Sequence, residues 1–136
     1  MILTYLDTGV LIAAFRGENI IAEKALTILE DSQRLFISSD ILKLELLPKA
    51  IFHKKELEIS FYQAFFDIAY QHLETSPHLI QQAIILGSEY SLAACDALHI
   101  AIANNTGAQE FITTERPEKP FFKVKNLNLK VISLAA

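Results

Sequence analysis

Two acidic residues stand just beyond apolar runs, where folded chains commonly place their chemistry. Asp7 directly follows the run at 1–6, and Glu115 comes two residues after the run at 110–113. If both runs are strands of one parallel sheet, the two carboxylates lie at the edge of the sheet where functional groups gather. Asp7 is equally suited to cap a helix that starts beside it, so the local sequence leaves cap and ligand open.

Two further carboxylates are each surrounded by apolar residues. Glu45 lies within DILKLELLPKA, and Asp96 is the one acid of SLAACDALHIAIA. A carboxylate in such surroundings needs a partner or a cation. A solvated helix face remains the alternative for Glu45, and a helix N-cap remains the alternative for Asp96.

Together, Asp7, Glu45, Asp96 and Glu115 form an oxygen-only ligand set. Such a set suits Mg²⁺ or Mn²⁺ rather than zinc. Without a cation, carboxylates held close together repel one another, which raises their pKa values. With one or two divalent ions they can activate water and stabilise the oxygens of a phosphodiester under attack. The set therefore supports the hypothesis of metal-dependent phosphodiester hydrolysis.

Three neighbouring side chains have narrower roles. The hydroxyl of Thr8 can bond a carboxylate or a metal-bound water. His99 lies three residues after Asp96, on the same side of a helix, and a hydrogen-bonded structural role is favoured over acid–base catalysis. Cys95 is the single cysteine, which excludes an intramolecular disulfide and a cysteine-based zinc cluster. We expect Cys95 to be a small buried hydrophobe.

The elements that must position these residues alternate between strands and helices. This alternation predicts an α/β fold with a parallel sheet, in which the middle of the chain, 39–105, forms an insertion-like helical layer. Pro48 is expected to kink or interrupt the helix that begins at Ser39 or Asp40. Strands are expected at 1–6, 35–38, 110–113 and 129–134, and the other helices at 9–16, 19–32, 56–73, 77–90 and 96–105.

Composition limits the class of protein. The 136 residues are 51% hydrophobic and 21% charged, which excludes disordered and fibrous chains and favours one domain over 1–136. No apolar run reaches the roughly 18 residues of a membrane helix, so no membrane partner is expected. The start, MILTYLD, lacks the basic region of a signal peptide. We therefore expect a soluble, cytoplasmic protein.

Charge is unevenly distributed along the chain. The net charge of −4 excludes an overall basic footprint for nucleic acid. Residues 116–130 nevertheless carry a local charge of +4, and residues 43–55 a local charge of +3. These segments are either solvated faces or patches for RNA, in which case Lys119, Lys123 and Lys125 contact the phosphates.

Four segments contain the candidate acids: YLDTGVLIAAF at 5–15, SSDILKLELLPKA at 38–50, SLAACDALHIAIA at 91–103 and FITTE at 111–115. These segments resemble the acidic blocks of the PIN-domain nucleases, in order and across essentially the whole chain. The chain is most similar to small bacterial proteins of the VapC toxin type. The resemblance implies a three-layer α/β/α PIN-like fold with a central parallel sheet, and a ribonuclease that depends on Mg²⁺ or Mn²⁺.

The resemblance also assigns roles to residues. It carries Asp7, Glu45 and Asp96 over as the core metal-binding acids, with Thr8 as a supporting hydroxyl. Thr113 matches the threonine of the family's Thr-x-Asp element, which places Glu115 where the fourth acid is normally Asp. A Glu is one methylene longer, so Glu115 reaches the metal through water or not at all.

Partners follow from the same resemblance. It implies an RNA substrate, an antitoxin protein that holds a type II toxin inactive, and a homodimer. An aromatic set in the helix at 56–73 is a candidate contact surface. We expect Phe61 and Phe65 to face the core, and Tyr62, Phe66 and Tyr70 to form a second stripe, although a position in the core is favoured for any single one of them.

Other interpretations remain. A catalytically weak PIN-like module that binds RNA or protein is the main alternative, because Glu115 departs from the family pattern. A phosphoacceptor receiver or a phosphatase needs a second acid close to Asp7, and the next acid is Glu18. A dinucleotide-binding domain needs a glycine-rich loop, whereas Gly9 stands alone.

Overall fold

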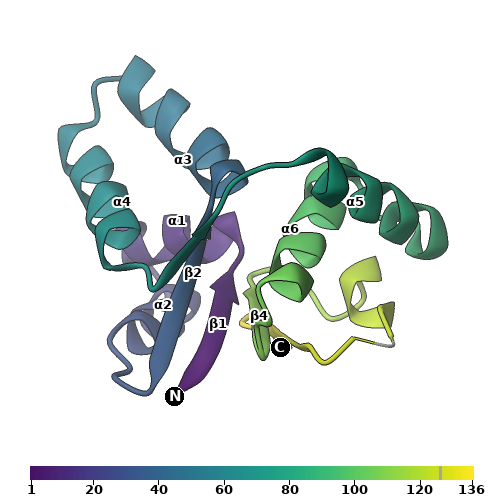
Figure 1. Ribbon diagram of the computed structural model, residues 1–136. Coiled ribbons are helices and arrows are strands. Elements are labelled where there is room, and N and C mark those ends of the chain that lie inside the picture. The colour runs from purple at the N-terminus through teal and green to yellow at the C-terminus, as the bar shows by residue number, and fades with distance from the viewer. Residues whose placement is uncertain (126) are drawn as a thin grey trace.

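The computed structural model describes residues 1–125 and 127–136, and it has a central parallel sheet between layers of helices (Figure 1). Every strand pairing is parallel, and the strand order is β3-β2-β1-β4-β5. The predicted α/β/α fold with a parallel sheet is therefore confirmed. The strands are β1 (Ile2–Leu6), β2 (Arg34–Ser39), β3 (Gln71–Leu73), β4 (Glu110–Thr113) and β5 (Lys130–Ser133).

The helices begin and end at residues suited to those positions. Asn19 caps α2 by accepting a hydrogen bond from the N–H of Ala22, and Pro77 occupies the first turn of α5, as the sequence predicts. The helices are α1 (Thr8–Arg16), α2 (Ile20–Leu29), α3 (Asp40–Phe52), α4 (Glu56–Ile68), α5 (Pro77–Tyr90) and α6 (Ala94–Asn105), with a short 3₁₀ helix at Pro120–Lys123. None of the described helices is long and apolar enough to span a membrane.

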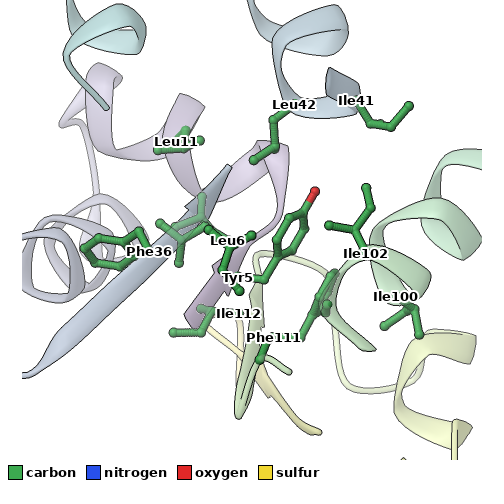
Figure 2. Close-up of a cluster of buried hydrophobic side chains, with 14 of the residues drawn as sticks. Tyr5, Leu6, Leu11, Phe36, Ile41, Leu42, Ile100, Ile102, Phe111 and Ile112 are labelled. Carbon is green, nitrogen blue, oxygen red and sulfur yellow. The ribbon is translucent and has the colours of Figure 1, made fainter. Parts of the chain in front are cut away.

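Strand β1 runs through the middle of the core. Its last two residues, Tyr5 and Leu6, are fully buried and point to opposite faces of the sheet, as successive strand residues do. The Tyr5 ring stacks on Phe111 of β4, with centroids 5.7 Å apart. Figure 2 shows the hydroxyl of Tyr5 directed out of this cluster, toward the start of α3. Strand β1 thus places a polar group, the hydroxyl of Tyr5, at the end of the sheet where the strand itself ends.

The predicted helix at 56–73 is wrong in its last part. Helix α4 ends at Ile68, and Gln71–Leu73 forms β3 at the edge of the sheet. The N–H of Tyr70 already donates to the carbonyl of Phe36 on β2, so the chain changes from helical to sheet pairing within two residues. The middle of the chain is therefore not a purely helical layer, because it supplies a strand.

Pro48 does not interrupt α3, which continues from Asp40 to Phe52. Proline deprives the carbonyl four residues earlier of its donor. That residue, Leu44, is 67% exposed, so water can serve the carbonyl and the helix tolerates the proline.

The aromatic residues of α4 face differently from the prediction. Phe65 is buried as expected, but Tyr62 is also buried, and Phe61 is only partly buried. Tyr70 is exposed because it lies beyond the end of the helix, before β3. Tyr62 therefore belongs to the core rather than to a second, outer stripe.

Candidate active site

Asp7 follows the central strand and is held at both carboxylate oxygens. Its Oδ1 accepts from the N–H of Thr8 at 2.8 Å, and its Oδ2 accepts from the hydroxyl of Thr113 at 2.9 Å. Asp7 is 9% exposed and Thr113 is fully buried. Asp7 is the N-cap of α1, yet the bond to Thr113 at the end of β4 fixes its carboxylate in a way that a helix cap does not require.

Glu45 reaches toward Asp7 from α3. Its Oε1 accepts from the hydroxyl of Thr8 at 2.8 Å and lies 2.5 Å from Nε2 of His99. The hydrogen bond with His99 lowers the pKa of Glu45, as does the one from Thr8, while partial burial acts in the opposite direction. A freely solvated carboxylate is thereby ruled out for Glu45, although 30% of its side chain remains exposed.

His99 lies between the elements that carry these acids. Its Nε2 is 3.7 Å from Oδ1 of Asp7, besides its contact with Glu45, and only 2% of its side chain is exposed. Its Nδ1 lies 2.6 Å from the hydroxyl of Tyr5. His99 is thus buried and hydrogen-bonded, as the sequence predicts. The role of Tyr5 is not foreseen from the sequence, although a tyrosine in an otherwise apolar strand calls for a polar partner.

Asp96 is not a helix cap. The N-cap of α6 is Ala93, without a side-chain hydrogen bond, and Asp96 lies in the first turn. Its pKa is raised, first by burial and then by the negative charges of Asp7 and Glu115. Among the described residues, no hydrogen bond or ion pair reaches its carboxylate, so Asp96 is a half-buried acid close to other acids and without a protein partner there.

Glu115 is attached to the site through its backbone. Its N–H donates to the hydroxyl of Thr113 at 3.0 Å, the same hydroxyl that donates to Asp7. Its carboxylate lies 4.0 Å from the ammonium of Lys119 and is 43% exposed. Thr113 therefore links the ends of β1 and β4, while the carboxylate of Glu115 forms an ion pair with Lys119.

Cys95 is exposed, so the prediction of a buried hydrophobe is wrong. It lies in the first turn of α6. Burial and then the charges of Glu45, Asp96 and Asp7 raise the pKa of its thiol. Three carboxylates from three separate elements thus act on one point, at the end of β1 where α3 and α6 stand on either side (Figure 1).

The donor chemistry of this region fits a hard divalent cation. All four acids offer oxygen, which Mg²⁺ and Mn²⁺ prefer, and the raised pKa of Asp96 is what a cation would reverse. In the present side-chain arrangement, no three Asp, Glu, His or Cys residues within 1–125 and 127–136 are grouped so as to hold one ion. The hydrogen bonds of Glu45 go to Thr8 and His99 instead.

Comparison with known proteins identifies relatives of the chain. The PIN domain family profile matches residues 4–116. A toxin–antitoxin complex from Klebsiella pneumoniae contains a chain with 23% identity and a TM-score of 0.71, covering 96% of this chain and 97% of that one. A VapBC2 complex from Rickettsia felis, bound to promoter DNA, gives 18% identity and a TM-score of 0.70, covering 96% and 98%.

A more distant structure is a VapC toxin of Mycobacterium tuberculosis that cleaves the sarcin–ricin loop. It has 13% identity and a TM-score of 0.61, covering 79% of this chain and 86% of that one. No curated protein sequence gives a significant match. At these identities the solved structures establish the shared fold.

Proposed function

Because the chain belongs to the PIN domain family, we propose that it is a metal-dependent endoribonuclease that hydrolyses RNA phosphodiester bonds. The observation that carries the proposal is the half-buried Asp96, whose carboxylate has no partner among the described residues and whose pKa is raised by burial and then by the nearby charges of Asp7 and Glu115. A chain gains nothing in stability from such an arrangement. A cation bound among these acids would offset the repulsion between their charges.

In this proposal Asp7, Glu45 and Asp96 hold Mg²⁺ or Mn²⁺, and Glu115 serves as a fourth, more remote acid. A bound divalent ion supplies the activation of water and the stabilisation of charge on the phosphate. The chain itself supplies the orientation. Thr113 fixes Oδ2 of Asp7, and Thr8 donates to Glu45, which restricts both carboxylates before any ion arrives.

The RNA is proposed to lie over the positive segment after β4. Lys119, Lys123 and Lys125 are exposed, and Lys119 is next to Glu115 at the edge of the site. Lysines at such a position attract phosphates without selecting a base sequence. The acids then need not attract the RNA themselves.

The protein is further proposed to act in the cytoplasm as a homodimeric toxin held inactive by an antitoxin. The structures from Klebsiella pneumoniae and Rickettsia felis are toxin–antitoxin complexes, which supports a protein partner. Exposed apolar residues such as Phe52 and Leu57, at the turn between α3 and α4, are further support, since exposed apolar surface marks contact sites.

Asp96→Asn tests the proposed activity. In the parent, RNA cleavage should require Mg²⁺ or Mn²⁺ and stop with EDTA. The variant should lose cleavage by orders of magnitude and also lose the rise in Tm that Mn²⁺ gives the parent by binding only the folded state. Without metal it should be at least as stable as the parent, because one repelling charge is gone.

Asp67→Asn, at an exposed acid of α4, is the matched control and should change neither cleavage nor the Mn²⁺ response. An Asp96→Asn protein with the parent's metal-induced shift would remove Asp96 from the site. The alternative, a catalytically weak module that binds RNA or protein, is favoured by the ion pair between Glu115 and Lys119. RNA binding without metal-dependent cleavage in the parent would select it.

A further inference from the structure

A chain of buried hydrogen bonds connects the end of β2 to the Glu45 carboxylate. The hydroxyl of Ser39 accepts from the N–H of Leu42 at 3.1 Å and lies 3.0 Å from the hydroxyl of Tyr5. The Tyr5 hydroxyl lies 2.6 Å from Nδ1 of His99, whose Nε2 contacts Glu45. Ser39 and Tyr5 are fully buried and His99 is 1% exposed, so water does not compete for these bonds.

The donors and acceptors allow one direction for this chain when the imidazole is neutral. The carboxylate of Glu45 can only accept, so Nε2 of His99 carries a proton. Nδ1 then accepts a hydrogen bond from the hydroxyl of Tyr5. The hydroxyl of Tyr5 in turn accepts from the hydroxyl of Ser39, whose oxygen accepts from the N–H of Leu42. Every member donates toward Glu45, and each hydroxyl and ring N–H in the chain has an acceptor.

The chain leaves one oxygen of Glu45 available. Both side-chain bonds, from Thr8 and from His99, go to Oε1, and among the described residues no bond goes to Oε2. An acid restrained at one oxygen and unoccupied at the other is oriented as a ligand. Loss of a partner that orients a ligand in this way typically costs about 10–100-fold in metal affinity.

We propose that His99 is a positioning residue for Glu45, and that Tyr5 and Ser39 fix its tautomer and the orientation of its ring. The inference deepens the proposed function and rests on it in one respect, namely that Glu45 is a metal ligand. It differs from general acid–base catalysis, because the bonds of His99 are directed to Tyr5 and Glu45 rather than toward substrate.

Mn²⁺ affinity, measured by titration calorimetry on the purified protein, tests the positioning role. His99→Phe keeps the bulk of the ring and removes the donor, and should weaken Mn²⁺ binding about 10–100-fold. His99→Gln places an amide N–H near the position of Nε2 and should retain most of the affinity. Tyr5→Phe should weaken binding by about tenfold, at the lower end of that range.

Tyr62→Phe is the matched control, because Tyr62 is a buried tyrosine whose hydroxyl donates to Glu58 on α4. It should bind Mn²⁺ as the parent does. Equal affinity in the parent, His99→Phe and Tyr5→Phe would overturn the proposal. If His99→Phe does not fold, Tyr5→Phe still decides the matter.

A second measurement needs no metal. Long-range ¹H–¹⁵N correlation spectra of the metal-free protein, at a pH where His99 is neutral, should show the proton on Nε2. Tyr5→Phe should give a mixture of tautomers. A proton on Nδ1 in the parent would overturn the hydrogen-bond chain. An Nε2–H tautomer in a parent that does not bind Mn²⁺ would instead refute the proposed function, and the positioning of a metal ligand with it.

Discussion

Two histidine–carboxylate pairs begin from neighbouring serines at the end of β2. On one side, Ser38 lies 2.7 Å from Nδ1 of His72, whose Nε2 lies 2.9 Å from Oδ1 of Asp40. On the other side, Ser39 reaches His99 and Glu45 through Tyr5, as described above. Successive residues of a strand point to opposite faces, so two adjacent serines start two separate networks.

The two networks differ in burial. The side chains of His72 and Asp40 are 30% and 45% exposed, whereas the side chain of His99 is 2% exposed. The more exposed set, Ser38, His72 and Asp40, is called the outer network. It connects the edge strand β3 to the start of α3, and Asp40 also accepts from the N–H of Thr75 at 2.9 Å. The buried set, which runs from Ser39 through Tyr5 and His99, is called the inner network. It ends at Glu45, an acid of the candidate site.

The outer network has the residue types of a Ser–His–Asp hydrolase triad, yet it cannot act as one. Ser38 is 1% exposed, so no substrate reaches its hydroxyl. Catalytic use requires an accessible nucleophile beside its base. Residue types and distances alone therefore do not identify a catalytic triad. The two networks are distinguished by the acid at which each ends, since Glu45 lies near Asp7 through Thr8 and His99, whereas Asp40 holds the edge strand through Thr75.

The largest expected difference between the networks is in RNA cleavage. Glu45→Gln removes a charge from the candidate site. Loss of a residue that only orients a metal ligand typically costs about 10–100-fold, and Glu45→Gln should reduce metal-dependent cleavage by more than this. Asp40→Asn changes the equivalent acid of the outer network and should leave the cleavage rate near that of the parent. Equal losses in the two variants would contradict the division of roles.

The next difference is in the stability of the metal-free protein. Tyr5→Phe leaves Nδ1 of His99 without its donor in a buried place, which should cost about 1–3 kcal/mol of unfolding free energy. Ser38→Ala removes the partner of a histidine that water can reach, and should cost only about 0.5–1.5 kcal/mol. Denaturant unfolding measures both values. A larger loss for Ser38→Ala would reverse the comparison.

Much of the fold is predictable because its signals are local. The apolar run before Asp7 and the run at 110–113 each indicate a strand, and Pro77 marks a helix start. The acids at the strand ends follow from these elements. By contrast, β3 has three residues, too few to show a periodicity, and its pairing with β2 is a long-range contact that the preceding helix pattern conceals.

The candidate site is predictable only as a set of acids. Asp96 is an effective capping type, so local sequence leaves cap and ligand open, but α6 begins earlier and places Asp96 inside its first turn. The bond between Tyr5 and His99 spans 94 positions of sequence. No spacing rule connects a tyrosine in a strand with a histidine in a distant helix, so the network that orients Glu45 emerges only from the folded chain.

The smallest expected effect concerns the pH dependence of stability in the outer network. The N–H of Thr75 and then the hydrogen bond with His72 hold the pKa of Asp40 below its ordinary value of 3.8. A carboxyl group with a lowered folded-state pKa contributes stability that is fully present above the unfolded pKa. That contribution is lost as the pH falls below 3.8 and through the folded-state pKa.

Asp40→Asn should therefore be less stable than the parent at neutral pH, and the difference should shrink as the pH falls below 3.8. Because the carboxylate is well exposed, solvent and salt screen its charge, so the change should be small and smaller still in high salt. Denaturant unfolding at a series of pH values measures it, with Asp67→Asn as the control for an exposed acid outside the network. A constant difference between parent and Asp40→Asn across this pH range would show that the charge of Asp40 does not stabilise the outer network. The stabilising contribution of Asp40 would then come from the geometry of its hydrogen bonds.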